Sequence, residues 1–181
     1  MPLSGPRRDR LVTAMAGAER LIPESQVRIE ITDPRDAGAR YCLQAYFAEL
    51  GHRFDAGFDP ARSISASDEQ MSLPNGLLLV ACLHGATVGC GALKLHMDTQ
   101  VAELKRMWVA PEVRGLGLGR RLVERLSAEA VSRGMVTLRL ETNRSLPEAK
   151  HLYETSGFVE VEPFNDDPYA QHWFQKDLRY K

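Results

Sequence analysis

Hydrophobic and polar residues follow two different periods along the chain, and these periods predict strands and helices. Apolar and polar positions alternate over residues 27–31 and 136–140, as they do in strands with one buried face. Continuous apolar runs elsewhere predict strands that are buried on both faces. The predicted strands are residues 27–31, 77–83, 86–95, 101–109, 136–140, 158–161 and 172–178.

Helices are predicted where apolar residues recur every three or four positions. This spacing is clearest at Leu118, Leu122, Leu126 and Ala130. The predicted start and stop signals are Thr32-Asp33-Pro34 with Gly51, the glycines at 115–119 with Gly134, and the capping box Ser145-x-x-Glu148 with Gly157. Residues 55–75 are rich in Gly, Pro, Ser and Asp, which predicts an irregular lid or a short further helix.

The order of these elements predicts how they connect. Residues 77–95 form a hairpin that turns at His84-Gly85. The strands at 101–109 and 136–140 enclose a helix, so we expect them to run parallel with a right-handed crossover. Residues 1–25 are predicted to be a flexible or loosely docked leader, and residues 26–181 the folded domain.

Composition and charge exclude several classes of protein. A chain of 181 residues with a formal net charge of −1 is expected to be one globular domain without a polybasic surface for nucleic acid or membrane. The basic and apolar residues near the N-terminus imitate a signal peptide, but Asp9 interrupts the basic region and the apolar run is short. Cys42, Cys82 and Cys90 lack CxxC spacing, which predicts reduced core thiols in a cytoplasmic protein and no metal site.

Three alternating glycines, Gly115, Gly117 and Gly119, lie between the strand at 101–109 and the helix that follows. Glycine lets backbone N–H groups approach an anion, and a helix N-terminus adds unpaired amides and a positive dipole end. Arg114 and Arg120 flank the glycines with positive charge. The stretch therefore predicts a phosphate cradle, although a glycine-rich connection without a ligand is the alternative. It matches neither the P-loop nor the dinucleotide fingerprint.

The pattern Arg114-x-x-Gly117-x-Gly119 resembles the acetyl-CoA signature of the GNAT superfamily of N-acetyltransferases. Residues 103–111 resemble the fourth strand of that family, and residues 152–158 resemble its LYxxxGF segment. The resemblance covers about residues 27–178. It implies an α/β (α+β) fold, a single GNAT-like domain whose mixed, mostly antiparallel sheet has about six to seven strands and is flanked by about four helices.

The resemblance also implies a cofactor, acetyl-CoA, and a site for it. Its pyrophosphate is expected over the backbone amides of Gly115, Leu116, Gly117, Leu118, Gly119 and Arg120, with Arg114 nearby. The pantetheine arm is expected along Met107, Trp108 and Val109, with a hydrogen bond to Asn143.

Acetyl transfer to an amine requires a base for the ammonium and an acid for the departing thiolate. Tyr153 occupies the tyrosine position of the family, where its hydroxyl would donate to the sulfur, while the alternative is a packed core tyrosine. Glu103 has the spacing of the general-base glutamate of the histone-acetylating members, while the alternative is a side chain that faces solvent.

The acceptor is predicted from the loop before the last strand. Asp166 and Asp167 could hold an ammonium group, Tyr169 could cover its apolar part, and Arg53 could bind a carboxylate. Tyr46 on the first helix is a further candidate. A solvated turn is the alternative for the loop.

These predictions favour an N-acetyltransferase that acts on a primary amine of a small molecule, either amino-acid-like or cationic, by direct transfer in a ternary complex. A protein or peptide acetyltransferase and a non-catalytic acyl-CoA sensor are the alternatives. The pattern does not distinguish acetyl from longer acyl groups. It also leaves the oligomeric state open, with a homodimer as one candidate.

Overall fold

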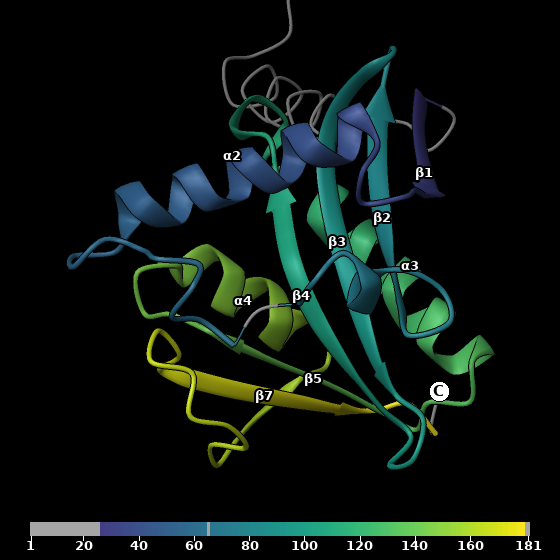
Figure 1. The fold of residues 1–181 in the computed structure, drawn as a ribbon, viewed down its shortest axis with the longest axis vertical. Coiled ribbons are helices and arrows are strands. Elements are labelled where there is room, and N and C mark those ends of the chain that lie inside the picture. Colours follow the sequence, from purple (N-terminus) through teal and green to yellow (C-terminus); the bar gives the residue numbers. More distant parts are fainter. Residues whose placement is uncertain (1–25, 65, 180–181) are drawn as a thin grey trace, which may run out of the picture.

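The computed structural model describes residues 26–64 and 66–179. They form one mixed β-sheet with helices packed against it (Figure 1). The seven strands lie in the order β1-β2-β3-β4-β5-β7-β6. Neighbouring strands are antiparallel except β4 and β5, which run parallel as predicted. The strands are β1 (Val27–Ile31), β2 (Gly76–Leu83), β3 (Ala86–His96), β4 (Val101–Val109), β5 (Thr137–Thr142), β6 (Val159–Val161) and β7 (His172–Asp177). The predicted leader, residues 1–25, lies outside the described residues.

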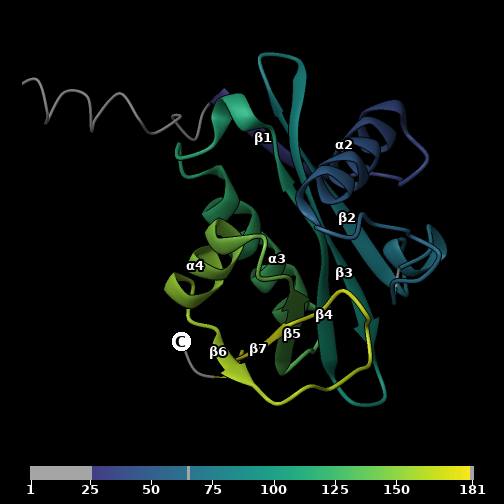
Figure 2. The ribbon, with the colours of Figure 1, turned by 90° about the vertical axis from the view of Figure 1, so that its left-hand side faces the viewer.

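Helices cover both faces of the sheet. They are α2 (Ala37–Arg53), α3 (Leu118–Ser132) and α4 (Pro147–Thr155), with the short 3-10 turns η2 (Glu69–Met71) and η3 (Pro111–Val113). Figure 2 shows α2 on one face and α3 and α4 on the other. Residues 55–75, predicted to be an irregular lid or a short helix, are irregular apart from the turn η2. No helix in residues 26–64 or 66–179 is long and apolar enough to cross a membrane.

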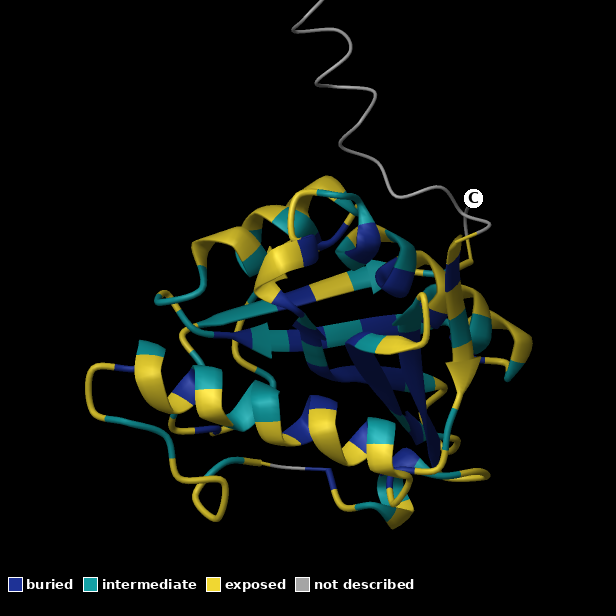
Figure 3. Cartoon of the chain, turned by 90° about the horizontal axis from the view of Figure 1, so that it is seen from above, coloured by how far each residue is buried: buried dark blue, intermediate teal, exposed yellow. Residues whose placement is uncertain are grey.

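The core lies between the sheet and its helices, as the dark-blue central strands in Figure 3 show. The predicted apolar face of α3 is confirmed, because Leu118, Leu122, Leu126 and Ala130 are all buried. The predicted end of α3 is also confirmed, since Gly134 follows it with a φ of +78°.

Two helix starts differ from the prediction because charged side chains have other partners. Helix α2 begins at Ala37 rather than at Pro34, and it continues to Arg53 past Gly51. Asp33 does not cap it; its carboxylate accepts hydrogen bonds from the backbone and side chain of Arg35.

The predicted capping box at Ser145 does not form either. The residue before α4 is Leu146, and no side chain caps the helix. Glu148, the expected reciprocal partner, pairs with Arg53 of α2.

The sheet opens between β4 and β5, and this opening positions the site. The two strands pair only from Val101 to Glu103 of β4, so the rest of β4 has no partner on that side. The register of the pairing between β3 and β4 also shifts near Arg106, which has a φ of +58°, so β4 has a bulge there. The bulge and the separation of the strands expose the backbone edge of Met107–Val109 to the space between β4 and β5.

We expect Gly76→Ala to destabilise the fold by about 3 kcal/mol, because overpacking a buried site forces the backbone to move. A Cβ atom there would lie 2.0 Å from the Gln70 carbonyl oxygen and 2.2 Å from that of Leu93. Gly51→Ala is the matched control, since its Cβ would meet nothing within 4 Å and the helix should gain about 0.5 kcal/mol. Urea unfolding measures both changes. Equal stability of the two variants would contradict the packing described for Gly76.

Candidate functional site

A cavity of about 510 Å³ lies in the opening beside β4. Its walls come from the free edge of β4, the glycine loop (residues 114–120), the end of α2 and one side of α4. Its lining residues include Met107, Trp108, Val109, Arg114, Gly115, Gly117, Leu118, Gly119, Arg120, Arg53 and Tyr153. The structure thus brings together most of the residues that were predicted to bind a cofactor. Leu116 is not part of this lining and packs against the core.

The glycine loop has the geometry of an anion cradle. Gly115 and Gly117 have φ values of +76° and +83°, which a residue with a side chain rarely adopts. Gly117 is also the residue before α3, so the loop leads directly into the unpaired amides of the helix N-terminus. A Cβ on Gly119 would lie 3.2 Å from Leu152 of α4, so the loop approaches α4 closely. Conformation therefore favours glycine at 115 and 117, and close packing favours it at 119.

Arg114 is held at the rim of this larger cavity by two contacts. Its Nε donates to the Val109 carbonyl at 2.9 Å, and its Nη2 donates to the Glu49 carboxylate at 2.5 Å. Glu49 also accepts a hydrogen bond from Trp108 at 3.1 Å. Glu49 of α2 therefore orients two of the predicted cofactor-binding residues.

Arg53 links α2 to α4 across the same cavity. Its guanidinium pairs with Glu49 and Glu148 and donates to the Ser145 carbonyl at 2.7 Å. These contacts raise the pKa of Arg53, with the hydrogen bond to Glu148 as the largest cause. The structure places Arg53 in the larger cavity and already pairs it with two carboxylates, so its predicted role as an acceptor ligand has no support from the geometry.

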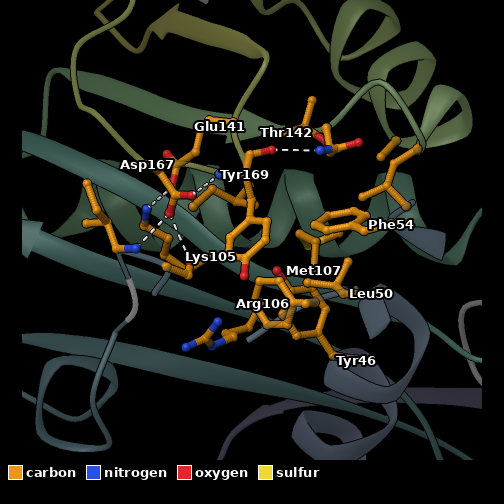
Figure 4. Close-up of a pocket in the computed structure, with 18 of the residues that line it drawn as sticks. Tyr46, Leu50, Phe54, Lys105, Arg106, Met107, Glu141, Thr142, Asp167 and Tyr169 are labelled. Carbon is orange, nitrogen blue, oxygen red and sulfur yellow. Dashed lines mark hydrogen bonds and ion pairs between the residues drawn. The ribbon is translucent and has the colours of Figure 1, made fainter. Parts of the chain in front are cut away.

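A smaller cavity of about 100 Å³ adjoins the larger one. The two share the side chains of Tyr46, Leu50, Met107, Leu146, Ala149 and Tyr153. Figure 4 shows the smaller cavity, with Glu141, Lys105 and Asp167 on one side and Leu50, Phe54 and Tyr46 on the other. The predicted candidates Tyr46 and Tyr153 therefore lie at the junction of two cavities.

Tyr153 is buried at this junction. Its ring packs against Phe158 and Phe174, with centroid distances of 5.8 and 6.4 Å. Burial, followed by the nearby charges of Tyr46 and Glu141, raises the pKa of the Tyr153 hydroxyl. The hydroxyl is therefore protonated at neutral pH and has a proton to give, although burial makes it a weaker acid than an exposed tyrosine.

Glu103 lies on β4 outside the lining of both cavities. Its carboxylate accepts from Arg139 at 2.6 Å and lies 3.5 Å from Lys105 and 3.2 Å from His96. Burial alone would raise the pKa of Glu103, but the hydrogen bond from Arg139 and these charges lower it overall. A carboxylate this well paired is a weak base, so the geometry does not support the predicted role of Glu103.

The residues of the predicted acceptor loop differ in their surroundings. Asp167 is buried and accepts from Ser63, Ile64 and the backbone of Tyr169 at 2.7–2.9 Å. Asp167 and Tyr169 line the smaller cavity, whereas Asp166 is exposed and lines neither.

Asn143 also lies in this region and lines the smaller cavity. Its amide donates to the Tyr169 carbonyl at 2.7 Å, and its oxygen accepts from the Ser145 backbone at 2.8 Å. The first bond joins two loops and the second lies within one loop, so both amide atoms already have partners in the protein and the predicted bond from Asn143 to a pantetheine arm has no support from the geometry.

Glu141, which no sequence motif indicated, lines the smaller cavity beside Lys105. The parallel pairing of β4 with β5 sets Glu103 opposite Arg139, so Lys105 and Glu141 follow two residues later on the same face. Aligning the charged residues of the two predicted strands in register could have found this pair.

The sequence is similar to a family model and to a curated protein that are both described as acetyltransferases. Residues 43–158 match the model of the acetyltransferase (GNAT) family. An IAA acetyltransferase from Azospirillum brasilense is 35% identical over 131 residues, which span 72% of this chain and 76% of that protein.

Solved structures resemble the fold as well. A candidate acyl-CoA N-acyltransferase from Klebsiella pneumoniae superimposes with a TM-score of 0.67 at 28% identity, over 86% of this chain and 99% of that one. A candidate streptothricin acetyltransferase from Bacillus anthracis, solved with acetyl coenzyme A, superimposes with a TM-score of 0.54 at 24% identity, over 62% and 68% of the two chains.

Proposed function

The chain belongs to the acetyltransferase (GNAT) family, and from this premise we propose that it transfers an acetyl group from acetyl-CoA to the primary amine of a small molecule. The family makes the chain an acyltransferase that uses acetyl-CoA; the acceptor class and the route of transfer are the proposal. The main support is that two cavities, one for each substrate, meet at Tyr153.

The larger cavity fits the donor. The left-handed backbone at Gly115 and Gly117 leaves room for an anion beside the N-terminus of α3, where a pyrophosphate would accept from backbone amides. Arg114 and Arg120 line the same cavity and would add charge-assisted contacts. The free edge of Met107–Val109 would pair with the amides of the pantetheine arm. When bound, acetyl-CoA supplies an acetyl thioester, the electrophile of the reaction.

Tyr153 acts as the proton donor in this proposal. Tyr153 lines both cavities, and its phenol is protonated at neutral pH, as an unperturbed tyrosine with a pKa of about 10 already is. It would therefore give a proton to the leaving thiolate. Its backbone position on α4 is fixed by the packing of its ring against Phe158 and Phe174.

Direct transfer is favoured because neither cavity is lined by a cysteine that could hold the acetyl group covalently. The chain has three cysteines, all free: Cys42 and Cys90 are buried elsewhere, and Cys82 lies on β2. The free thiols also support the proposed cytoplasmic location, since disulfides are rare there.

The smaller cavity fits the amine end of an acceptor. Phe54, Phe58 and Tyr169 line it, with ring centroids 4.8–5.8 Å apart. Because the cavity holds about 100 Å³, only the amine and a few neighbouring atoms of the acceptor would enter it.

A screen of amines tests the proposal. The protein is mixed with acetyl-CoA and single members of a panel of short alkylamines, diamines, amino acids and peptides, and release of the CoA thiol is followed. We expect one or more small amines to accelerate release and to gain one acetyl group by mass spectrometry. Acceleration by peptides alone would favour the protein-acetylating alternative, and binding of CoA without any acceleration would favour a sensor.

A further inference from the structure

Glu141, at the end of β5, is a buried carboxylate that is only half satisfied. Its side chain is 10% exposed. One oxygen, Oε1, pairs with the Lys105 ammonium group. The other, Oε2, is buried and has no hydrogen-bond partner among the described residues. Burying a charged oxygen without a hydrogen-bond partner costs free energy. This atom is therefore placed to accept a hydrogen bond from a molecule that is not part of the described chain.

The ion pairs of this cluster are divided unequally between Glu103 and Glu141. Lys105 lies between Glu103 and Glu141, and Arg139 pairs with Glu103. Glu103 therefore has two cations, and Glu141 shares one of them. Arg106, a further buried cation, lines the same cavity with its guanidinium over the Tyr46 ring. The third carboxylate of this region, Asp167, already accepts three hydrogen bonds from the chain.

Glu141 also has the right position. It lines the smaller cavity together with Tyr153 and Met107, which form the junction with the larger cavity. Its charge contributes to the raised pKa values of Tyr46 and Tyr153, after the larger effect of burial in each case. The carboxylate is therefore close enough to interact electrostatically with both phenols.

We propose that Glu141 Oε2 binds the protonated amine of the acceptor and takes up its proton. This inference rests on the proposed function. An N–H bond of the ammonium breaks, an O–H bond forms on Glu141, and the amine keeps the electron pair with which it attacks. The proton on Glu141 later passes to solvent, which restores the carboxylate.

The cavity also restricts the body of the acceptor. Glu141 and Lys105 occupy its polar side, while Phe54 and Tyr46 lie opposite (Figure 4). The rings would pack against alkyl carbons, and the small volume would reject a branched or cyclic group near the amine. The acceptor class is therefore a primary amine on a short, unbranched alkyl arm.

Competition between n-butylamine and n-butanol tests this assignment, because the two differ mainly in the charge of the head group. With CoA bound, the parent protein is expected to bind n-butylamine at least about tenfold more tightly than n-butanol, as a paired buried charge would give. In Glu141→Gln that ratio is expected to fall to about one. Acetylation of n-butylamine should fall about a hundredfold in kcat/KM.

Three comparisons make the result decisive. Glu154→Gln, an exposed substitution on α4 outside both cavities, should match the parent in every measurement. Unchanged CoA affinity and melting temperature in Glu141→Gln would show that it folds. Glu141→Asp, which keeps the charge, should restore part of the preference for the amine.

The inference is overturned if the parent protein does not prefer n-butylamine, if Glu141→Gln keeps the preference, or if Glu103→Gln abolishes it instead. Failure of the proposed function would look different, since no amine of any kind would then accelerate thiol release from acetyl-CoA.

Discussion

Replacing Tyr153 by Phe is expected to lower kcat about a thousandfold while leaving the affinity for CoA unchanged. The hydroxyl contributes only as the thiolate leaves, so it stabilises the transition state and not the bound donor. The ring packs against Phe158 and Phe174, and Phe keeps that packing. Steady-state kinetics and calorimetric titration with CoA measure the two quantities.

Tyr41→Phe is the matched control for this experiment. Tyr41 also lies on a helix and contacts Trp108 edge-to-face, but its side chain is exposed and lines neither cavity. Removing the hydroxyl of Tyr41 should leave kcat near the parent value. If Tyr153→Phe kept parental kcat, or if Tyr46→Phe alone produced the large loss, Tyr153 would not be the proton donor.

Replacing Gly117 by Val is expected to weaken CoA binding about a hundredfold, because a β-branched residue at a φ of +83° costs up to about 3 kcal/mol. The loop of the variant relaxes to another conformation, and its amides no longer converge on the anion. Binding must then restore the strained conformation, and this cost reduces the measured affinity. Calorimetric titration with CoA measures the change.

Gly134→Val separates this local effect from general strain. Gly134 has nearly the same φ, +78°, but it lies at the opposite end of α3 from the cradle. The variant should lose stability and keep parental CoA affinity. Unchanged affinity in Gly117→Val, or an equal loss in Gly134→Val, would mean that the cradle does not act through the backbone of Gly117.

Local patterns were sufficient to predict most of the fold. The spacing of Leu118, Leu122 and Leu126 follows directly from burial of one helix face, and the strand-helix-strand order around it determines that β4 and β5 are parallel. Gly134 and Gly157 both end helices with positive φ, as their positions predicted.

Contacts between distant segments were not visible in those patterns. Glu148 looked like a capping residue, but it pairs with Arg53, 95 positions away. Asp33 is a different case, because the side chain that binds its carboxylate, Arg35, lies only two positions away and competes locally with the helix N-terminus. A capping signal depends only on neighbours in sequence, whereas an arginine brought in by the fold competes for the same oxygen atoms.

In the candidate site, too, local motifs predicted some features, whereas others depend on how the strands pair. The glycine loop and Tyr153 follow local motifs, and the structure places both beside one cavity. Glu103 was predicted from spacing alone, yet its surroundings of Arg139, Lys105 and His96 depend on strand pairing. The same pairing places Glu141 beside Lys105 in the smaller cavity, and finding it from the sequence requires the register of the two strands.

The central claim is that acetyl-CoA and an amine occupy adjoining cavities at the same time and react directly. Initial rates measured while both substrate concentrations are varied test it most directly, with the best amine of the screen as acceptor. We expect double-reciprocal plots that intersect, because both substrates must be bound before CoA is released. Parallel lines would show a covalent acetyl-enzyme, and thiol release that does not depend on the amine would show that no transfer occurs; either result would contradict the claim.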